Sequence, residues 1–359
     1  MSQRFTLKPS TAGLLAAFMH VAVLSAAVLM LAGCQGNRYA QFGGYAQGGV
    51  WSVKANIKGV KARPAEIQKG IEAILEEIDT TLSGYNKASQ LSRYNDGEPV
   101  QLSPMFLEVQ QAADRFKEET GGALNCAAGP LFDIWGFGFK TDSLPSDELV
   151  RQTLADCGIT VCSEKRPKTG TNTNNTGICS EKQAKTGTNH QPTLNFNAIA
   201  QGYSCDKVAA YLYSLGIKDM LVDIGEIFCD GLNPSGKPWR VGIDKPEDGN
   251  NSPGAKMEGI WESNGGPQGV VTSGNYRKFY IKDGVKYSHT IDPRTGYPVQ
   301  HKLLSATVIA PTAMAADAYA TYCMVIGTQK AQEFILSRPD LEACLISEEI
   351  WTSPGFKLQ

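Results

Sequence analysis

The chain has 359 residues and a formal net charge of −2, from 34 Lys and Arg against 36 Asp and Glu. Hydrophobic residues make up 42% of it and charged residues 19%, which is typical of a globular protein and excludes a wholly disordered one. Because nucleic-acid-binding proteins present a basic surface, the near-neutral balance also argues against a nucleic-acid partner.

The N-terminal residues have the pattern of an export signal. Two basic residues, Arg4 and Lys8, precede a stretch without charge from Pro9 to Asn37. A basic start, an apolar middle and small residues at the end are typical of a secretory signal peptide. The stretch contains Leu31-Ala32-Gly33-Cys34, which resembles a bacterial lipobox and implies cleavage before Cys34 and lipidation of its sulfur.

We therefore expect a lipoprotein signal peptide over residues 1–33 and a membrane anchor at Cys34. The alternative is an uncleaved transmembrane anchor, because the apolar stretch is long enough to span a bilayer. That alternative leaves the Leu-Ala-Gly-Cys order unexplained. In either case the protein is expected to be exported, tethered to a membrane and facing the periplasm or the cell exterior.

The body is expected to follow a short linker. Residues 34–49 are rich in Gly, Gln and Tyr, which predicts a flexible tether. The folded region is expected over residues 50–359, because residues 50–57 alternate apolar and polar side chains like a strand. Apolar spacing and turn signals then predict helices over 64–81, 103–120, 206–215 and 313–326, a short helix around 149–154, and strands over 220–224, 239–243, 278–281 and 285–291. Because helices and hairpin-joined strands are mixed, we predict an α+β fold of mixed sheets with flanking helices, not a doubly wound parallel sheet.

One insertion, at about 160–193, differs from the rest of the body. Residues Cys162 to Asn172 recur as Cys179 to Asn189, with nine of eleven positions identical. Two polar copies cannot bury a stacked core, so we predict a duplicated surface loop, not a solenoid. The sequence leaves open whether Cys162 pairs with Cys179 or whether both join a metal site with His190.

Two polar residues interrupt the apolar helix predicted over 313–326. Asp317 and Thr321 are four residues apart, so their oxygens lie on one face of that helix. Such oxygens suit Mg²⁺, which keeps positions for water and phosphate. Taken alone, the pair is more often structural, with Asp317 stabilising the helix N-terminus and Thr321 bonding back to a carbonyl.

A second candidate group surrounds His289. In the predicted strand, His289 shares one face with Tyr287 and Ile291 and is followed by a turn. A histidine on such a face is usually a packing residue, although the adjacent turn raises the possibility of a catalytic base. Upstream, Arg277 follows Gly274 and is a candidate anion ligand or a partner in a surface salt bridge.

Together these residues resemble the FAD:protein FMN transferases, or ApbE family, from about residue 50 to about residue 336 apart from the duplicated loop. Each block alone is modest evidence, but seven blocks match in order, which argues strongly against coincidence. They are Ser83-Gly84-Tyr85 with Leu91–Asn95, Gly129–Leu131 with Trp135–Gly138, Ala198–Tyr203, Lys237–Ile243, Thr272–Gly274, Ser288–Pro293, and Ala316–Ala318 with Thr321.

The resemblance implies an α+β fold with a large and a smaller domain, and an enzyme that transfers the FMN part of FAD to a Thr or Ser hydroxyl of a target protein, releasing AMP. It implies Mg²⁺ held by Asp317, Thr321 and the backbone carbonyl of Ala198, with His289 as the base. The acceptors would be subunits of membrane-associated redox complexes. The positions that it implies for FAD binding are Tyr85, Ala123, Leu124, Asn125, Asn195, Gln201, Arg277 and Ile291.

Two other activities remain open. One is an FAD diphosphatase, in which water replaces the protein hydroxyl, and the other is a non-catalytic flavin-binding lipoprotein. Within the resemblance, Tyr85 favours transfer over hydrolysis. The chain departs from the family pattern at positions that bear on FAD, and none of these departures falls on the base or the metal residues. They are Asn195 in place of Asp, Gln201 in place of a frequent Lys, Glu226 in place of a frequent Gly, and Asn125 in a stretch that usually contains Asp.

Overall fold

The computed structural model describes residues 38–137, 144–159, 192–250, 252, 254–276, 279–282 and 285–359. The predicted signal peptide, Cys34, the repeats of the duplicated loop with Cys162 and Cys179, and Arg277 lie outside these residues. The six cysteines within them are buried and free. None of the helices in this part of the chain has the length and apolarity needed to cross a bilayer.

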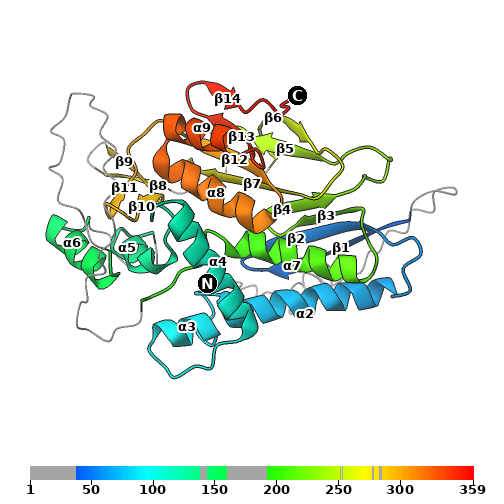
Figure 1. The fold of residues 1–359 in the computed structure, drawn as a ribbon, viewed down its shortest axis with the longest axis horizontal. Helices are drawn as coiled ribbons and strands as arrows, with labels where there is room; N and C mark the ends of the chain where they lie inside the picture. Colours follow the sequence, from blue (N-terminus) through cyan, green and yellow to red (C-terminus); the bar gives the residue numbers. More distant parts are fainter. Residues whose placement is uncertain are drawn as a thin grey trace, which may run out of the picture.

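An eight-stranded antiparallel sheet forms the centre of the fold (Figure 1). Because every pairing in it is antiparallel, the predicted α+β class is confirmed. All six residues of β12 are buried, as expected for a strand covered on both faces. In spatial order the strands are β1 (Tyr39–Ala46), β2 (Gly49–Asn56), β3 (Met220–Asp223), β4 (Ile227–Asp230), β7 (Gln268–Gly274), β12 (Ser305–Ala310), β13 (Glu342–Ile346) and β14 (Ile350–Thr352).

Helices pack on one face of the sheet, where α7 and α8 lie next to one another (Figure 1). Their apolar side chains meet those of the strands in two large core clusters. The opposite face is covered by a hairpin whose Trp261 and Val241 pack on Val270 and Ile309 of the sheet. The helices are α2 (Pro64–Leu82), α3 (Gln90–Asn95), α4 (Pro104–Glu119), α7 (Ala200–Ser214), α8 (Ala313–Ile326) and α9 (Thr328–Ser337), and the hairpin is β5 (Arg240–Asp244) with β6 (Met257–Glu262).

A smaller unit lies beside the sheet and has its own apolar core (Figure 1). Leu131, Trp135, Val150, Leu154 and Ile291 are buried together there. A large and a smaller unit are the division that the resemblance implied. The elements of the smaller unit are η2 (Cys126–Ala128), α5 (Gly129–Ile134), α6 (Asp147–Asp156), β8 (Phe279–Lys282), β9 (Val285–Ser288), β10 (Ile291–Asp292) and β11 (Tyr297–Pro298).

The expected flexible tether over 34–49 is wrong for its second half. Strand β1 pairs with β2 along its whole length, from Tyr39 opposite Asn56 to Ala46 opposite Gly49. Phe42 is buried in the core of the sheet. The glycines that suggested flexibility have a packing role instead, because a Cβ added at Gly44 would lie 2.9 Å from Nε1 of the buried Trp51. The folded body therefore begins at least by residue 39, not at residue 50.

Helix α7 also begins earlier than predicted, at Ala200 instead of Asp206. The sequence Ala200-Gln201-Gly202 has weak helix propensity because of its glycine. The structure offsets this weakness through a neighbouring helix, since the backbone N–H of Gly202 donates a hydrogen bond to the Asp317 carboxylate at 3.1 Å. The first turn of α7 is thus stabilised by a contact that is remote in sequence.

Candidate functional site

Asp317 is a buried carboxylate without a counter-ion in the part of the chain that the structure describes. It lies in the second turn of α8, is 5% exposed, and accepts the Gly202 N–H at Oδ2. No other donor to its carboxylate is found among the described residues. The pKa of the Asp317 carboxyl is raised to about 7, mainly by burial, with the Gly202 hydrogen bond lowering it and the nearby charge of Asp206 adding to the rise. Because an unpaired buried charge costs free energy, this carboxylate is expected to carry a proton or to bind a cation.

Thr321 lies one turn after Asp317 on α8 and is half-buried. Its Oγ1 is 3.4 Å from the Oγ of Ser273 on β7. The alternative in which Thr321 bonds back to a helix carbonyl is not seen, because its hydroxyl contacts the sheet. Ser273 was part of a matching block but not of the predicted site, and it adds a second hydroxyl oxygen beside α8.

The carbonyl oxygen of Ala198 lies just before α7. Ile199 is the N-cap of this helix, so the first intrahelical bond runs from the Tyr203 N–H to the Ile199 carbonyl, at 2.9 Å. The Gly202 N–H is one of the first-turn donors that have no intrahelical partner, and it donates to Asp317. Within the described ranges, no hydrogen bond to the Ala198 oxygen is found. This places an available carbonyl in the turn that leads to the Asp317 contact.

These oxygens are a mixed donor set. The described residues contain no cluster of three or more His, Cys, Asp or Glu side chains that could hold a metal. A metal at this point therefore depends on one carboxylate, on hydroxyl groups and on a backbone carbonyl. Such a set of hard oxygens fits Mg²⁺, which is commonly held by one or two carboxylates and keeps several waters.

His289 lies in a bend between β9 and β10, and the prediction of one strand over 285–291 is wrong. The side chains on either side of it, Ser288 and Thr290, are buried, whereas His289 is half-buried. Thr290 is anchored by its Oγ1, which donates to Asn275 Oδ1 at 2.5 Å. Tyr287 and Ile291 both pack in the core of the smaller unit, and the His289 ring meets Phe137, which packs against the same core.

Aromatic rings surround the His289 bend. The His289 ring meets Phe137 edge-on, with ring centroids 6.4 Å apart. Phe137 stacks on Tyr280 at 5.2 Å, Tyr280 on Tyr287 at 5.3 Å, and Tyr287 on Trp135 at 5.9 Å. This continuous stack fixes the β8–β9 hairpin against the end of α5, so the position of His289 is set by packing as well as by the backbone.

Several positions implied for FAD border the loop that leads into α7. Tyr85 is 65% exposed and its hydroxyl accepts a hydrogen bond from Asn197 Nδ2 at 3.4 Å. Asn195 donates its backbone N–H to the Cys126 carbonyl at 2.7 Å. Gln201 Nε2 donates to the Ile224 carbonyl at 3.5 Å. The loop therefore brings Tyr85, Asn195 and Gln201 near the turn that holds Ala198.

Other implied FAD positions present no exposed side chain. Ala123, Leu124 and Ile291 are at most 3% exposed, and Ile291 belongs to the core of the smaller unit. Only backbone groups at these three positions are left to meet a ligand. Glu226 accepts the Sγ–H of buried Cys205 through its backbone carbonyl, at 3.0 Å, a bond that does not involve the side chain in which the position departs from the family pattern.

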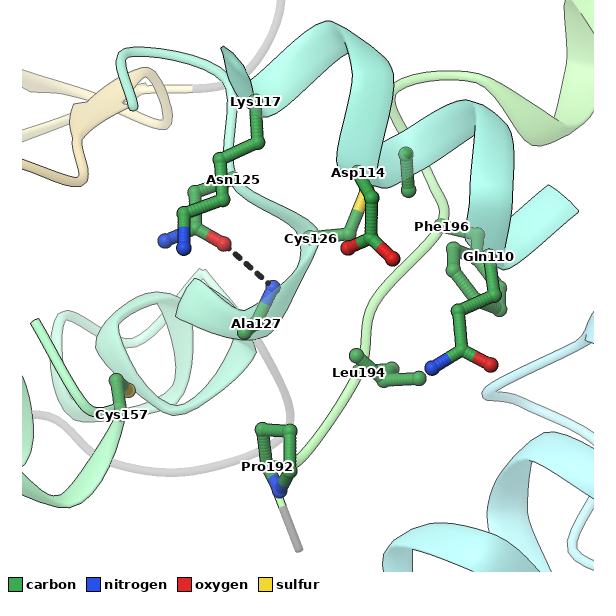
Figure 2. Close-up of a pocket in the computed structure, with 11 residues that line it drawn as sticks. Gln110, Asp114, Lys117, Asn125, Cys126, Ala127, Cys157, Pro192, Leu194 and Phe196 are labelled. Atoms are coloured by element: carbon green, nitrogen blue, oxygen red, sulfur yellow. Dashed lines mark hydrogen bonds between the residues drawn. The ribbon is translucent and has the colours of Figure 1, made fainter. Parts of the chain in front are cut away.

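A cavity of about 190 Å³ adjoins Asn125 (Figure 2). The Asn125 side chain accepts the Ala127 N–H at 3.0 Å, which caps the short helix η2. Figure 2 shows Asp114, Gln110 and Lys117 of α4 around the same space, with Leu194 across from them. Asn125 is thus both a residue that lines this cavity and one of the positions implied for FAD binding.

Comparison with known proteins gives a consistent result. Residues 48–345 match the model of the ApbE family. The chain is 33% identical over 363 residues to the FAD:protein FMN transferase of Escherichia coli K12, covering 95% of this chain and 97% of that protein. It is 36% identical over 315 residues to the FAD:protein FMN transferase of Vibrio cholerae, covering 86% and 88%.

Solved structures agree with the sequence relatives. The flavin transferase ApbE from Vibrio cholerae superposes with a TM-score of 0.69 at 31% identity, covering 88% of this chain and 98% of that chain. The flavinyl transferase ApbE from Pseudomonas stutzeri in its apo form gives a TM-score of 0.71 at 28% identity, covering 90% and 96%. The likeness spans both the central sheet and most of the remaining chain.

Proposed function

Because the chain belongs to the ApbE family, we propose that it is an FAD:protein FMN transferase that depends on Mg²⁺. The single observation that carries the metal dependence is the buried Asp317 carboxylate, which has no counter-ion among the described residues. Thr321 and Ser273, whose hydroxyl oxygens are 3.4 Å apart, and the carbonyl of Ala198 before α7 are proposed to supply further oxygens. Bound there, Mg²⁺ would neutralise charge on the FAD diphosphate and favour the departure of AMP.

His289 is proposed to accept the proton of the acceptor hydroxyl. The hydroxyl oxygen forms a bond to the phosphorus of the FMN half, and the bond from that phosphorus to the bridging diphosphate oxygen breaks, so that AMP leaves. An imidazole suits this step because it titrates near neutral pH. The bend between β9 and β10 and the Phe137 contact hold the ring in place during the transfer.

Tyr85 is proposed to stack on the flavin, since it supplies an aromatic ring among the implied FAD positions and is 65% exposed. The loop residues Asn195 and Gln201 then lie on the side of the metal residues. Their departures from the family pattern remove a carboxylate and an ammonium group, respectively, which alters FAD affinity without touching the reacting atoms.

One assay separates this proposal from its alternatives. Purified protein is mixed with FAD, Mg²⁺ and a flavin-acceptor domain that carries a reactive Thr. We expect the acceptor to become covalently fluorescent and AMP to appear in equal amount. Free FMN without labelled acceptor identifies a diphosphatase instead, and unchanged FAD identifies a flavin-binding protein without this activity.

The cellular location of the enzyme is proposed from its N-terminal sequence. We expect Cys34 to carry a lipid and to hold the enzyme on an exported membrane face, next to membrane-associated redox subunits that serve as acceptors. Cys34→Ser should release the protein from membranes or block its processing, which fractionation and immunoblotting detect. Intact mass spectrometry of the wild-type protein that still shows residues 1–33 attached excludes the lipidation.

A further inference from the structure

Helices α7 and α8 cap one another at their N-termini. Asp206, in the second turn of α7, accepts the backbone N–H of Ala313 at Oδ1 and of Met314 at Oδ2, at 2.8 and 2.9 Å. These are the first two residues of α8. In return Asp317, in the second turn of α8, accepts the N–H of Gly202, which is the third residue of α7. Each helix thus supplies the carboxylate that satisfies backbone donors of the other.

The reciprocal bonds replace caps that the local sequence does not provide. The first turns of a helix leave N–H groups without intrahelical partners. At α7 the N-cap residue Ile199 offers no side-chain hydrogen bond. At α8 the N-cap residue Thr312 accepts only from Ala315 N–H, at 3.1 Å. Asp206 therefore satisfies the two preceding donors of α8.

The two helix ends approach so closely that no side chain fits between them. A Cβ added at Gly202 would lie 2.3 Å from the Ala313 carbonyl oxygen and 2.7 Å from the Met314 Cα. Ala313 lies four residues before Asp317, so a shift at the Asp206 bonds is passed along one helical turn to the carboxylate. The contact of Asp206 with Ala313 and Met314 therefore caps α8 and also fixes the orientation of the Asp317 carboxylate.

We propose that Asp206 is a positioning residue for the Asp317 carboxylate, an inference that rests on the proposed metal-dependent function. The carboxylate of Asp206 bonds the backbone of α8 and is not among the oxygens proposed for the metal. It holds the first turn of α8 against α7, so that Asp317, Thr321 and the Ala198 carbonyl keep the spacing that a Mg²⁺ ion with near-octahedral coordination requires. Residues that orient metal ligands in this way commonly change metal affinity 10- to 100-fold when removed.

The test compares Asp206→Ala with Thr312→Ala. Both variants remove a capping side chain from the N-terminus of α8, but only Asp206→Ala removes the hydrogen bonds that connect α7 to α8. Binding of Mg²⁺ alone is measured by calorimetry without FAD, well below the melting temperature of each protein. We expect Asp206→Ala to weaken Mg²⁺ binding by about tenfold or more. Thr312→Ala should stay within about twofold of wild type, although its melting temperature falls as well.

Equal Mg²⁺ affinity in the two variants overturns the inference. If Asp206→Ala does not fold, Asp206→Asn takes its place. Its amide keeps one acceptor oxygen and directs an NH₂ group at the other backbone donor, so weaker Mg²⁺ binding than in Thr312→Ala is again expected. A wild-type protein that binds no Mg²⁺ refutes the metal assignment itself, and this result is distinct from a failure of Asp206 to position the carboxylate.

Discussion

His289→Ala should slow FMN transfer by about 10²- to 10⁴-fold, the usual loss for a removed general base, while FAD and Mg²⁺ still bind. Binding should persist because His289 lies in the smaller unit, whereas the proposed metal oxygens belong to α8, to β7 and to the turn before α7. Single-turnover transfer rates, measured beside FAD titrations, separate the two effects. A variant that retains the full rate removes His289 from the mechanism.

His301→Ala provides the matched control for this substitution. His301 is a half-buried histidine whose ring nitrogen lies 2.8 Å from the Met324 carbonyl at the end of α8, and whose Nδ1 accepts the Leu303 N–H at 3.3 Å. Burial lowers the pKa of its imidazole. Its removal should reduce the melting temperature and leave the transfer rate near wild type, since these bonds are structural.

Asp317→Asn should abolish Mg²⁺-dependent FAD binding at millimolar Mg²⁺ and reduce transfer accordingly, with partial recovery in excess Mg²⁺. The substitution keeps the shape of the side chain and an oxygen for the Gly202 N–H, but it removes the negative charge. Thr321→Val, which removes a hydroxyl oxygen from the same proposed site, should show the same dependence on Mg²⁺ with a smaller loss. If Asp317 only stabilises a helix end, the cost is instead about 0.3–1 kcal/mol of stability and activity survives. Wild-type FAD affinity and Mg²⁺ dependence in Asp317→Asn contradict the metal assignment.

The pH dependence of the stability of the metal-free protein provides a second test of the role of Asp317. The folded-state pKa of Asp317, about 7, is above the value of an exposed Asp, so the folded state holds a proton that the unfolded state has released. The contribution of this carboxyl to stability should therefore decline as pH rises from about 4 to about 7. Asp317→Asn should lack that decline, and wild-type Mg²⁺ binding below pH 7 should release a proton that calorimetry in two buffers detects.

Local spacing was enough to find part of the site. The i, i+4 relation placed Asp317 and Thr321 on one helix face, and the structure keeps them there. Ser273 was not assigned because its contact with Thr321 depends on how α8 packs across β7. The contact between Asp317 and the first turn of α7 depends on the bond from the Gly202 N–H, which joins residues 115 positions apart. Such relations follow from tertiary packing and leave no periodic signal in the sequence.

The errors in the fold have equally specific causes. Strand β1 was mistaken for a tether because its glycines read as flexible, whereas they leave room for Trp51. The strand expected over 285–291 is interrupted by a bend at His289, and Thr290 beyond the bend bonds Asn275 through its side chain, a contact that the local sequence does not indicate. The long amphipathic helices α2 and α4 and the apolar α8 were predicted well, because their own side chains determine them.

The early start of β1 limits how far the enzyme can work from a membrane. With Cys34 lipidated as proposed, only Gln35 to Arg38 separate the anchored residue from the paired strand that begins at Tyr39. Five residue steps of extended chain span about 17 Å, so that strand stays within this distance of the headgroups. Acceptors must then come to the enzyme by lateral diffusion in the same leaflet or extend their Thr-bearing segments down to it. Confinement of both proteins to one membrane face raises the local concentration of the acceptors.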